Sequence, residues 1–307
     1  MRILLLGGAG FLGANVTESL LAAGHSVHVV DRNMESMRAC PVLASAASLH
    51  DVNVTEAADV VRLIDELAIE CVVNFVSTLL PSSSYRAFAS EMRNLTVPAF
   101  ELLNDLVPRQ IKYVYFSSGG TVYGAEGHCD KSEEAPTRPI NHYGLAKLLF
   151  EQYIVFLART QGLRFLIVRP SNPYGPFQSP QRMQGLVAVT LDRILRGQEI
   201  EIWGDGSVVR DYVWVKDLAY AVTSLMATSS WNETYNVGTG IGYSVNEVIA
   251  VISSVVGRSA TVSYKPARVV DAPRIVLNVG KLKRAIRYEP VDLHAGIERY
   301  IGGLNGF

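Results

Sequence analysis

Tyr143 and Lys147 stand four residues apart in a stretch, 141–160, whose pattern predicts a helix. Side chains at that spacing share one helical face, so both can point at the same reacting group. An unperturbed phenol has a pKa near 10, and only about one part in a thousand is ionised at pH 7. Lowering that pKa by about three units takes roughly 4 kcal/mol of extra stabilisation of the phenolate, part of which a nearby ammonium supplies. The pair therefore predicts a proton-abstracting tyrosine tuned by a lysine, although the same spacing also occurs by chance on many helices.

A glycine-rich loop at the start of the chain predicts a phosphate site. The apolar run 3–6 has the length of a buried strand, and Gly7, Gly10 and Gly13 follow it before a helical pattern begins. In such a unit the first glycine allows a tight turn and the second lets the backbone approach a pyrophosphate. The third lets helix and strand pack closely. The spacing predicts a dinucleotide on the helix N-terminus.

A second predicted strand, 27–30, ends at Asp31, whose carboxylate can accept hydrogen bonds from ribose hydroxyls. Asp31 would repel a 2′-phosphate, which favours NAD over NADP, and the neighbouring Arg32 softens that preference. A positive nicotinamide ring would join Lys147 in lowering the pKa of Tyr143. Tyr143 could then take a hydroxyl proton while hydride leaves the same carbon for NAD.

Composition excludes several other classes of protein. The chain has 307 residues, 49% of them hydrophobic, and a formal net charge of -1, with no cluster of basic residues that would indicate a nucleic-acid surface. Cys40, Cys71 and Cys129 lack metal-ligand spacing, so we expect no metal site and free thiols in a reducing compartment. No run approaches the roughly 18 apolar residues of a membrane span, and no signal peptide is apparent. We therefore expect a soluble cytoplasmic protein.

Strand-like and helix-like segments alternate through the first half, which predicts an α/β fold of the Rossmann type with a doubly wound parallel sheet. The predicted strands are 3–6, 27–30, 48–54, 71–75, 112–116 and 164–168, and the predicted helices include 56–67 (capped by Thr55), 85–106 and 141–160.

Beyond Pro176 the segments are shorter, which predicts a smaller C-terminal α/β domain that binds the substrate. Its predicted helices are 185–196 and 245–256, and its strands are 199–203 and 261–264. A strand at 236–238 is expected to return to the first sheet. The predicted division is 1–170 plus about 208–243 for the NAD-binding domain and about 171–207 plus 244–307 for the substrate domain. We expect a crevice between the two domains, at the carboxyl ends of the strands, to hold the second substrate.

Several motifs together resemble the extended short-chain dehydrogenase/reductases and, within them, the NAD-dependent epimerase/dehydratase family of nucleotide-sugar enzymes. They are GGAGFLG at 7–13, FSSGGTVYG at 116–124, YGLAK at 143–147, RPSNPYGP at 169–176 and GDGSVVRDYVWVKDLA at 204–219. The resemblance covers nearly the whole chain and is far more specific for the family than for the sugar. It implies tightly bound NAD, a nucleotide-sugar substrate carried by UDP, and a homodimer formed through the helices at 85–106 and 141–160.

The resemblance also implies cofactor-binding positions along the first half of the chain. They are Gly7, Gly10, Phe11, Leu12, Gly13, Asp31, Arg32, Asn33, Asp51, Val52, Phe75, Val76, Ser77, Asn94, Ser117, Tyr143, Lys147 and Pro170. Phe11 and Leu12 would lie beside the pyrophosphate, and Asn94 would lie behind the loop that follows the fourth strand.

The implied substrate-binding positions are Ser77, Gly119, Thr121, Tyr143, Asn172, Gly185, Leu186, Glu201, Trp203, Arg210, Arg268 and Asp271. Arg210 and Arg268 would clamp the diphosphate through their bidentate guanidinium groups. Each stands near an aspartate in the sequence, so a surface ion pair is the alternative for both.

The chain departs from the family pattern at Gly119, where many members place a serine or threonine that contacts the reacting hydroxyl. Ser118 or Thr121 could replace it, and we favour Thr121, so the predicted catalytic group is Tyr143, Lys147, Thr121 and Ser118. Sugar dehydratases carry an acidic pair where this chain has Gly120 and Thr121, which counts against dehydration.

These features predict an NAD-dependent nucleotide-sugar 4-epimerase for a UDP-hexose, UDP-N-acetylhexosamine or UDP-hexuronate. The alternatives within the family are a nucleotide-sugar dehydratase or reductase and an epimerase of a polyprenyl-diphosphate-linked sugar. A non-catalytic dinucleotide sensor is the alternative from another class. Such sensors usually lose the tyrosine–lysine pair, which this chain keeps.

Overall fold

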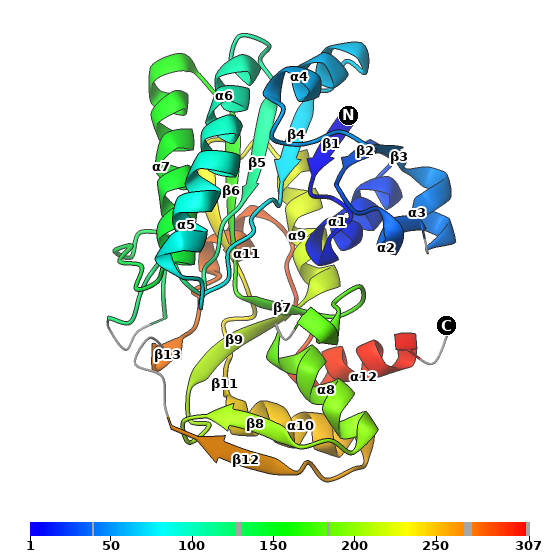
Figure 1. The fold of residues 1–307 in the computed structure, drawn as a ribbon, viewed down its shortest axis with the longest axis vertical. Coiled ribbons are helices and arrows are strands. Elements are labelled where there is room, and N and C mark those ends of the chain that lie inside the picture. The colour runs from blue at the N-terminus through cyan, green and yellow to red at the C-terminus, as the bar shows by residue number, and fades with distance from the viewer. Residues whose placement is uncertain (39, 127–129, 183–184, 267–271, 305–307) are drawn as a thin grey trace.

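A parallel sheet of seven strands is the centre of the computed structural model, which describes residues 1–38, 40–126, 130–182, 185–266 and 272–304. The strand order is β10-β6-β5-β4-β1-β2-β3 (Figure 1). The strands are β1 (Arg2–Leu6), β2 (Ser26–Val30), β3 (Ser48–His50), β4 (Cys71–Asn74), β5 (Lys112–Phe116), β6 (Phe165–Pro170) and β10 (Glu233–Val237). The order reverses between β1 and β4, and ligands of such sheets bind at that point, outside the carboxyl ends of the strands. The predicted Rossmann-type fold is confirmed.

Helices cover both faces of this sheet, as the crossovers between parallel strands require. One face carries α1 (Phe11–Ala22), α2 (Glu35–Arg38), α3 (Pro41–Ala46) and α9 (Val215–Ala227). The other carries α4 (Ala57–Glu66), α5 (Tyr85–Glu91), α6 (Val97–Leu106) and α7 (His142–Gln161). Figure 1 shows α5 and α6 end to end, running alongside α7 on one flank of the molecule.

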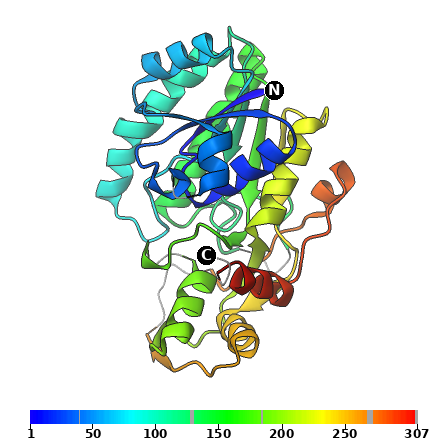
Figure 2. The ribbon, with the colours of Figure 1, turned by 90° about the vertical axis from the view of Figure 1, so that its right-hand side faces the viewer.

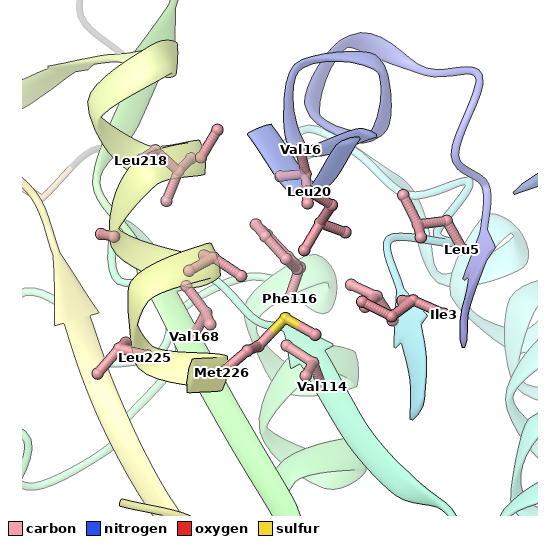
Figure 3. Packing of buried hydrophobic residues seen from close by; sticks show 14 of the residues in the cluster. Ile3, Leu5, Val16, Leu20, Val114, Phe116, Val168, Leu218, Leu225 and Met226 are labelled. Atoms are coloured by element: carbon pink, nitrogen blue, oxygen red, sulfur yellow. The ribbon is translucent and has the colours of Figure 1, made fainter. Parts of the chain in front are cut away.

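The first of these faces is closed by side chains from α1, α9 and the sheet (Figure 3). Leu20 of α1 and Leu218 of α9 are fully buried, together with Ile3 and Leu5 of β1 and Val114 of β5. Fully burying such a side chain stabilises the fold by about 1.5–3 kcal/mol. This packing fixes the glycine loop between β1 and α1 against the sheet edge.

A smaller unit lies beside the carboxyl edge of the sheet, seen below it in Figures 1 and 2. It contains a four-stranded sheet, in which β9 pairs with β7, β11 and β13, and a two-stranded sheet of β8 and β12. Its strands are β7 (Asn172–Tyr174), β8 (Ile200–Trp203), β9 (Val209–Trp214), β11 (Gly242–Ser244), β12 (Val262–Lys265) and β13 (Arg274–Ile275). Its helices are a 3-10 turn η2 (Pro180–Arg182), α8 (Leu186–Arg196), α10 (Val245–Val256) and α12 (Leu293–Leu304), whereas α11 (Gly280–Ala285) packs on the large sheet.

The segments that belong to each of the two units differ from those in the predicted domain division. β10 does join the first sheet beside β6, as expected from 236–238. However, β9 falls inside the predicted NAD-binding part and pairs within the smaller sheet. Conversely, Leu282 of α11 and the neighbouring Tyr288 pack into the core on the α1 face of the large sheet.

Local details also differ from the sequence prediction. Thr55 does not cap the fourth helix, which begins after Glu56 with no side-chain cap. The predicted helix 85–106 is interrupted by a π-helical turn, η1 (Met92–Thr96). Cys40 and Cys71 are free thiols, and Cys129 lies outside the described residues. No helix in the described part of the chain is long and apolar enough to cross a membrane.

Candidate active site

The glycine loop is shaped by close backbone contacts at the end of β1. Gly7 has φ +74°, a conformation that favours glycine. A Cβ on Gly13 would lie 2.4 Å from the Cα of Gly8, so helix α1 can approach the loop only without a side chain there. A Cβ on Gly8 would lie 2.8 Å from Leu5 and 2.9 Å from Val29, a requirement that the sequence analysis missed.

The N-terminus of α1 suits the pyrophosphate of a dinucleotide. The helix begins at Phe11, and its N-cap, Gly10, supplies no side-chain hydrogen bond to the first turn. The backbone N–H groups of that turn, with the positive end of the helix dipole, are a ready anion site. At the end of β2, the Asp31 carboxylate accepts hydrogen bonds from the backbone N–H groups of Ala9 (3.1 Å) and Asn33 (3.2 Å). The carboxylate thus stands beside the loop, where the ribose of an NAD molecule would reach it.

The tyrosine–lysine pair lies in the first turns of α7. Asn141 caps this helix by accepting a hydrogen bond from the backbone N–H of Gly144 at 2.8 Å. Lys147 is buried, and its Nζ donates to the carbonyl oxygen of Phe116, the last residue of β5, at 2.8 Å. The same Nζ lies 5.7 Å from the ring centroid of Tyr143. The pair therefore faces the carboxyl edge of the sheet.

Burial dominates the electrostatics of the pair. It raises the pKa of Tyr143 to about 12, against the opposing effect of a hydrogen bond from Ser118, while the Glu91 charge raises it further. Burial lowers the pKa of Lys147 to about 8, and the Glu91 and Glu151 charges act in the other direction. Without a cofactor, desolvation of the phenolate therefore leaves the pKa of Tyr143 above its ordinary value. The expected lowering by Lys147 together with a positive nicotinamide stays a prediction. The positive charge of a bound nicotinamide would lower the pKa of Tyr143.

Gly119 has no room for a side chain. A Cβ there would lie 2.6 Å from the Cδ1 atom of Leu277 and 3.0 Å from the carbonyl oxygen of Arg169. Leu277 is fully buried and fills the space that a serine or threonine would need. The next position, Gly120, is open, since a Cβ there would meet nothing nearer than 3.9 Å.

Ser118 takes the place beside the phenol: its side chain is hydrogen-bonded to Tyr143. Thr121, which the sequence analysis favoured for this role, has a buried Oγ1 with no hydrogen-bond partner among the described residues. Its backbone carbonyl packs against Gly144, where a Cβ would lie 2.6 Å away. The structure therefore puts Ser118, and not Thr121, in contact with the predicted base.

The loop after β4 approaches the same edge. The ring of Phe75 packs against Phe116, with centroids 4.3 Å apart. The hydroxyl of Ser77 donates to the carboxylate of Glu91 at 2.9 Å, so this side chain points toward α5. Glu91 is 6% exposed, and the sequence analysis missed it because no motif marks it.

Other predicted cofactor positions lie where strands end or where α1 begins. They are Leu12, Arg32, Asp51, Val52, Val76, Ser117 and Pro170, of which Arg32 and Asp51 are exposed. Asn94 is not brought to the site, because it is exposed and donates to Ser90 at 3.1 Å. A π-helical turn contains an extra residue, which shifts the side chains that follow to another face of the helix.

The predicted diphosphate and sugar contacts lie on the smaller unit or at its junction with the sheet. Asn172 donates to the carbonyl oxygen of Asp211 at 2.9 Å, and Arg210 is partly buried on β9. Gly185 and Leu186 begin α8, and β8 carries Glu201 and the exposed Trp203. The remaining two, Arg268 and Asp271, lie outside the described residues.

A dinucleotide loop at the switch point, with a tyrosine–lysine pair facing the same edge, defines an NAD-dependent enzyme of the extended short-chain dehydrogenase/reductase class. The family model described as "NAD dependent epimerase/dehydratase family" matches residues 3–238. The chain belongs to this family, and its cofactor is NAD.

Similar proteins cover nearly all of the chain. A UDP-glucose 4-epimerase of Mycolicibacterium smegmatis is 30% identical over 317 residues, covering 98% of this chain and 97% of the relative. The crystal structure of a UDP-glucose 4-epimerase of Thermotoga maritima with UDP-glucose is 31% identical, has a TM-score of 0.92 and covers 100% of this chain and 99% of that one. The crystal structure of the Thermus thermophilus UDP-glucose 4-epimerase, in complex with NAD, is 30% identical, has a TM-score of 0.89 and gives the same coverage.

Proposed function

We propose that this protein is an NAD-dependent nucleotide-sugar 4-epimerase that acts on a UDP-linked hexose, N-acetylhexosamine or hexuronate. The observation that carries the proposal is the Tyr143 phenol, hydrogen-bonded to Ser118 and one helical turn from Lys147, at the sheet edge beside the glycine loop. The similarity to UDP-glucose 4-epimerases over the whole chain supports the substrate class.

The arrangement suits a transient oxidation at C4 of the sugar. Tyr143 and Ser118 bind the 4-hydroxyl, and Tyr143 takes its proton. The glycine loop and Asp31 would hold NAD, which would supply the acceptor and later the donor of hydride for C4, with return to the opposite face of the sugar. Tyr143 then gives the proton back to O4, so the epimer forms with no net oxidation. Lys147 would hold the nicotinamide ribose, and its charge favours the phenolate.

The loop 117–121 after β5, which the structure describes in full, carries no carboxylate for the loss of water from the sugar. Gly120 and Thr121 stand where a dehydratase has its acidic pair, and neither can donate or accept a proton at neutral pH. Release of a 4-keto product would identify a dehydratase, and a requirement for added NAD(P)H would identify a reductase. Activity only on a polyprenyl-diphosphate sugar would change the carrier, and bound NAD without any turnover would indicate a sensor.

The test is to incubate the purified protein with UDP-glucose, UDP-N-acetylglucosamine and UDP-glucuronate and to identify the products by NMR. Tyr143→Phe should lower turnover by about 10²–10⁴-fold, the range for loss of a general base. NAD should still be found bound to this variant by mass spectrometry. Tyr220→Phe, at an exposed position on α9, is the matched control and should leave turnover unchanged. No conversion of any of the three sugars by the wild-type protein would contradict the proposal.

We also propose that two copies pair through the flank formed by α5, α6 and α7. Leu149 and Phe156 of α7 are 44% and 47% exposed, and Val97 of α6 is 50% exposed. Leu148 and Val155 are partly buried and pack against the core. The sequence alone did not distinguish such core positions from exposed interface positions. An exposed apolar strip along neighbouring helices is typical of a surface that another protein covers.

A further inference from the structure

The buried carboxylate of Glu91 accepts several hydrogen bonds from the loop that follows β4. It is the last residue of α5 and is 6% exposed. Its carboxylate accepts hydrogen bonds from the backbone N–H groups of Thr78 (2.5 Å) and Leu79 (3.1 Å) and from the hydroxyls of Ser77 (2.9 Å) and Thr78 (2.7 Å). One buried carboxylate thus holds three consecutive residues of the loop that follows β4.

That loop lies between the two parts of the candidate active site. On one side, a Cβ on Gly7 would lie 3.1 Å from Val76 at the start of the loop, so the loop packs directly against the glycine turn. On the other side, the carbonyl oxygen of Ser83 lies 3.2 Å from Nδ1 of His142, the residue before Tyr143. Fixing the loop therefore fixes a segment that touches both the dinucleotide loop and the start of α7.

Glu91 also acts on the catalytic pair through its charge. Lys147 is 4% exposed and its ammonium donates to the Phe116 carbonyl, an uncharged acceptor. A buried ammonium needs a nearby negative charge to stay protonated. Glu91 lines a cavity together with Tyr115 and Ala146, and Nζ of Lys147 lies 4.9 Å from the ring centroid of Tyr115. The charges of Glu91 and Glu151 both raise the pKa of Lys147. Glu151 is already paired with the Arg169 guanidinium at 2.6 and 3.0 Å, whereas the hydrogen-bond donors to Glu91 are uncharged.

We propose that Glu91 is a positioning residue for the reaction: its carboxylate fixes the loop 77–79 and places a negative charge on the cavity that Tyr115 and Ala146 line, next to the catalytic pair. The inference rests on the proposed function of the Tyr143 site. It goes beyond that function, because none of the motifs quoted above for the resemblance includes Glu91.

The first test follows Lys147 directly and does not depend on turnover. In protein labelled with 13Cε-lysine, the Lys147 signal is assigned by its loss in Lys147→Met and titrated by NMR. In Glu91→Gln the pKa of Lys147 should fall below its wild-type value by about one unit, the size typical of losing a close opposite charge. Glu66→Gln, at an exposed position of α4, is the matched control and should not move the signal. An unchanged Lys147 pKa in Glu91→Gln would overturn the inference.

The variant Thr78→Val distinguishes the effect of the Glu91 charge on Lys147 from the effect of loop packing. It removes one hydroxyl donor to Glu91 and keeps the carboxylate, so the Lys147 pKa should stay at its wild-type value. If Thr78→Val shifts that pKa as far as Glu91→Gln does, the effect comes from loop packing and the charge argument fails. If Glu91→Gln does not fold, Glu91→Asp takes its place: it keeps the charge, so a Lys147 pKa near the wild-type value supports the inference and a fall of about one unit overturns it.

The pH profile of kcat gives a second readout. Without the Glu91 charge, both the phenol and the ammonium lose their protons at lower pH, so both limbs of the profile should move to lower pH in Glu91→Gln. A merely structural role would raise KM or lower stability and leave the limbs in place, which would count against the inference. A wild-type protein that converts no UDP-sugar would contradict the proposed function while leaving the NMR test of Glu91 intact.

Discussion

Replacing Gly119 by alanine places a methyl group where the structure has no space. Its Cβ would lie 2.6 Å from Cδ1 and 3.0 Å from Cδ2 of Leu277, and 3.0 Å from the carbonyl oxygen of Arg169. Carbon atoms in good contact are about 3.5–4.0 Å apart, so the closest contact is short by about 1 Å. Leu277 is fully buried against Val122 and Tyr123, and the Arg169 carbonyl belongs to β6, which is held between β5 and β10. Neither neighbour can move away freely.

Overpacking of this kind destabilises the folded state by about 1–3 kcal/mol. A glycine-to-alanine change also stabilises it by about 0.4–1 kcal/mol, because it restricts the unfolded chain. We therefore expect Gly119→Ala to lower the free energy of unfolding by about 1–2 kcal/mol. Gly120→Ala is the matched control, since its Cβ would meet nothing nearer than 3.9 Å. It should change the free energy of unfolding by less than about 0.5 kcal/mol or raise it slightly.

Urea unfolding of both variants, followed by circular dichroism, measures the difference. Leu277→Ala should cost about 2–5 kcal/mol alone but make room for the new methyl group. In the Leu277→Ala background the cost of Gly119→Ala should shrink, since only the Arg169 carbonyl contact at 3.0 Å remains. This appears as a favourable coupling of about 1 kcal/mol. If Gly119→Ala is as stable as Gly120→Ala, or if the coupling is absent, Leu277 does not explain the glycine in this loop.

Three further predictions concern the hydroxyl, a histidine pair and the helical flank. Ser118→Ala should lower kcat by about 10²-fold, the loss typical of one donor at a reacting oxygen, and a change only in KM would contradict its role. His28 and His50 are hydrogen-bonded at 3.1 Å, and burial is the main cause that lowers both pKa values below 6.5. The unfolded chain therefore binds more protons near pH 6.5, so the free energy of unfolding should fall from pH 7 to pH 5, and His28→Gln should flatten this slope in urea unfolding. If the dimer forms as proposed, Leu149→Glu should give a monomer in light scattering, and the same mass for both proteins would contradict that interface.

Local patterns in the sequence were enough to predict much of the fold. The helix 245–256 was predicted with the bounds that α10 has, and its start is fixed locally by a capping box between Ser244 and Glu247. The glycine loop and the strand ending at Asp31 follow from local backbone requirements. Pairing partners were harder to predict, because β9 joins a small sheet whose other strands lie far from it in sequence. The π-helical turn that moves Asn94 to the surface had no predictive signal either.

By itself the sequence determined the class of enzyme, since the glycine spacing and the pair Tyr143 and Lys147 depend only on short-range periodicity. Only the tertiary structure decided which hydroxyl lies beside the phenol, because Leu277, distant in the chain, occupies the space at Gly119. It also decided the direction of the pKa shift of Tyr143 and the place of Glu91. Both depend on burial and on charges from separate elements, and neither quantity is encoded in the spacing of residues along the chain.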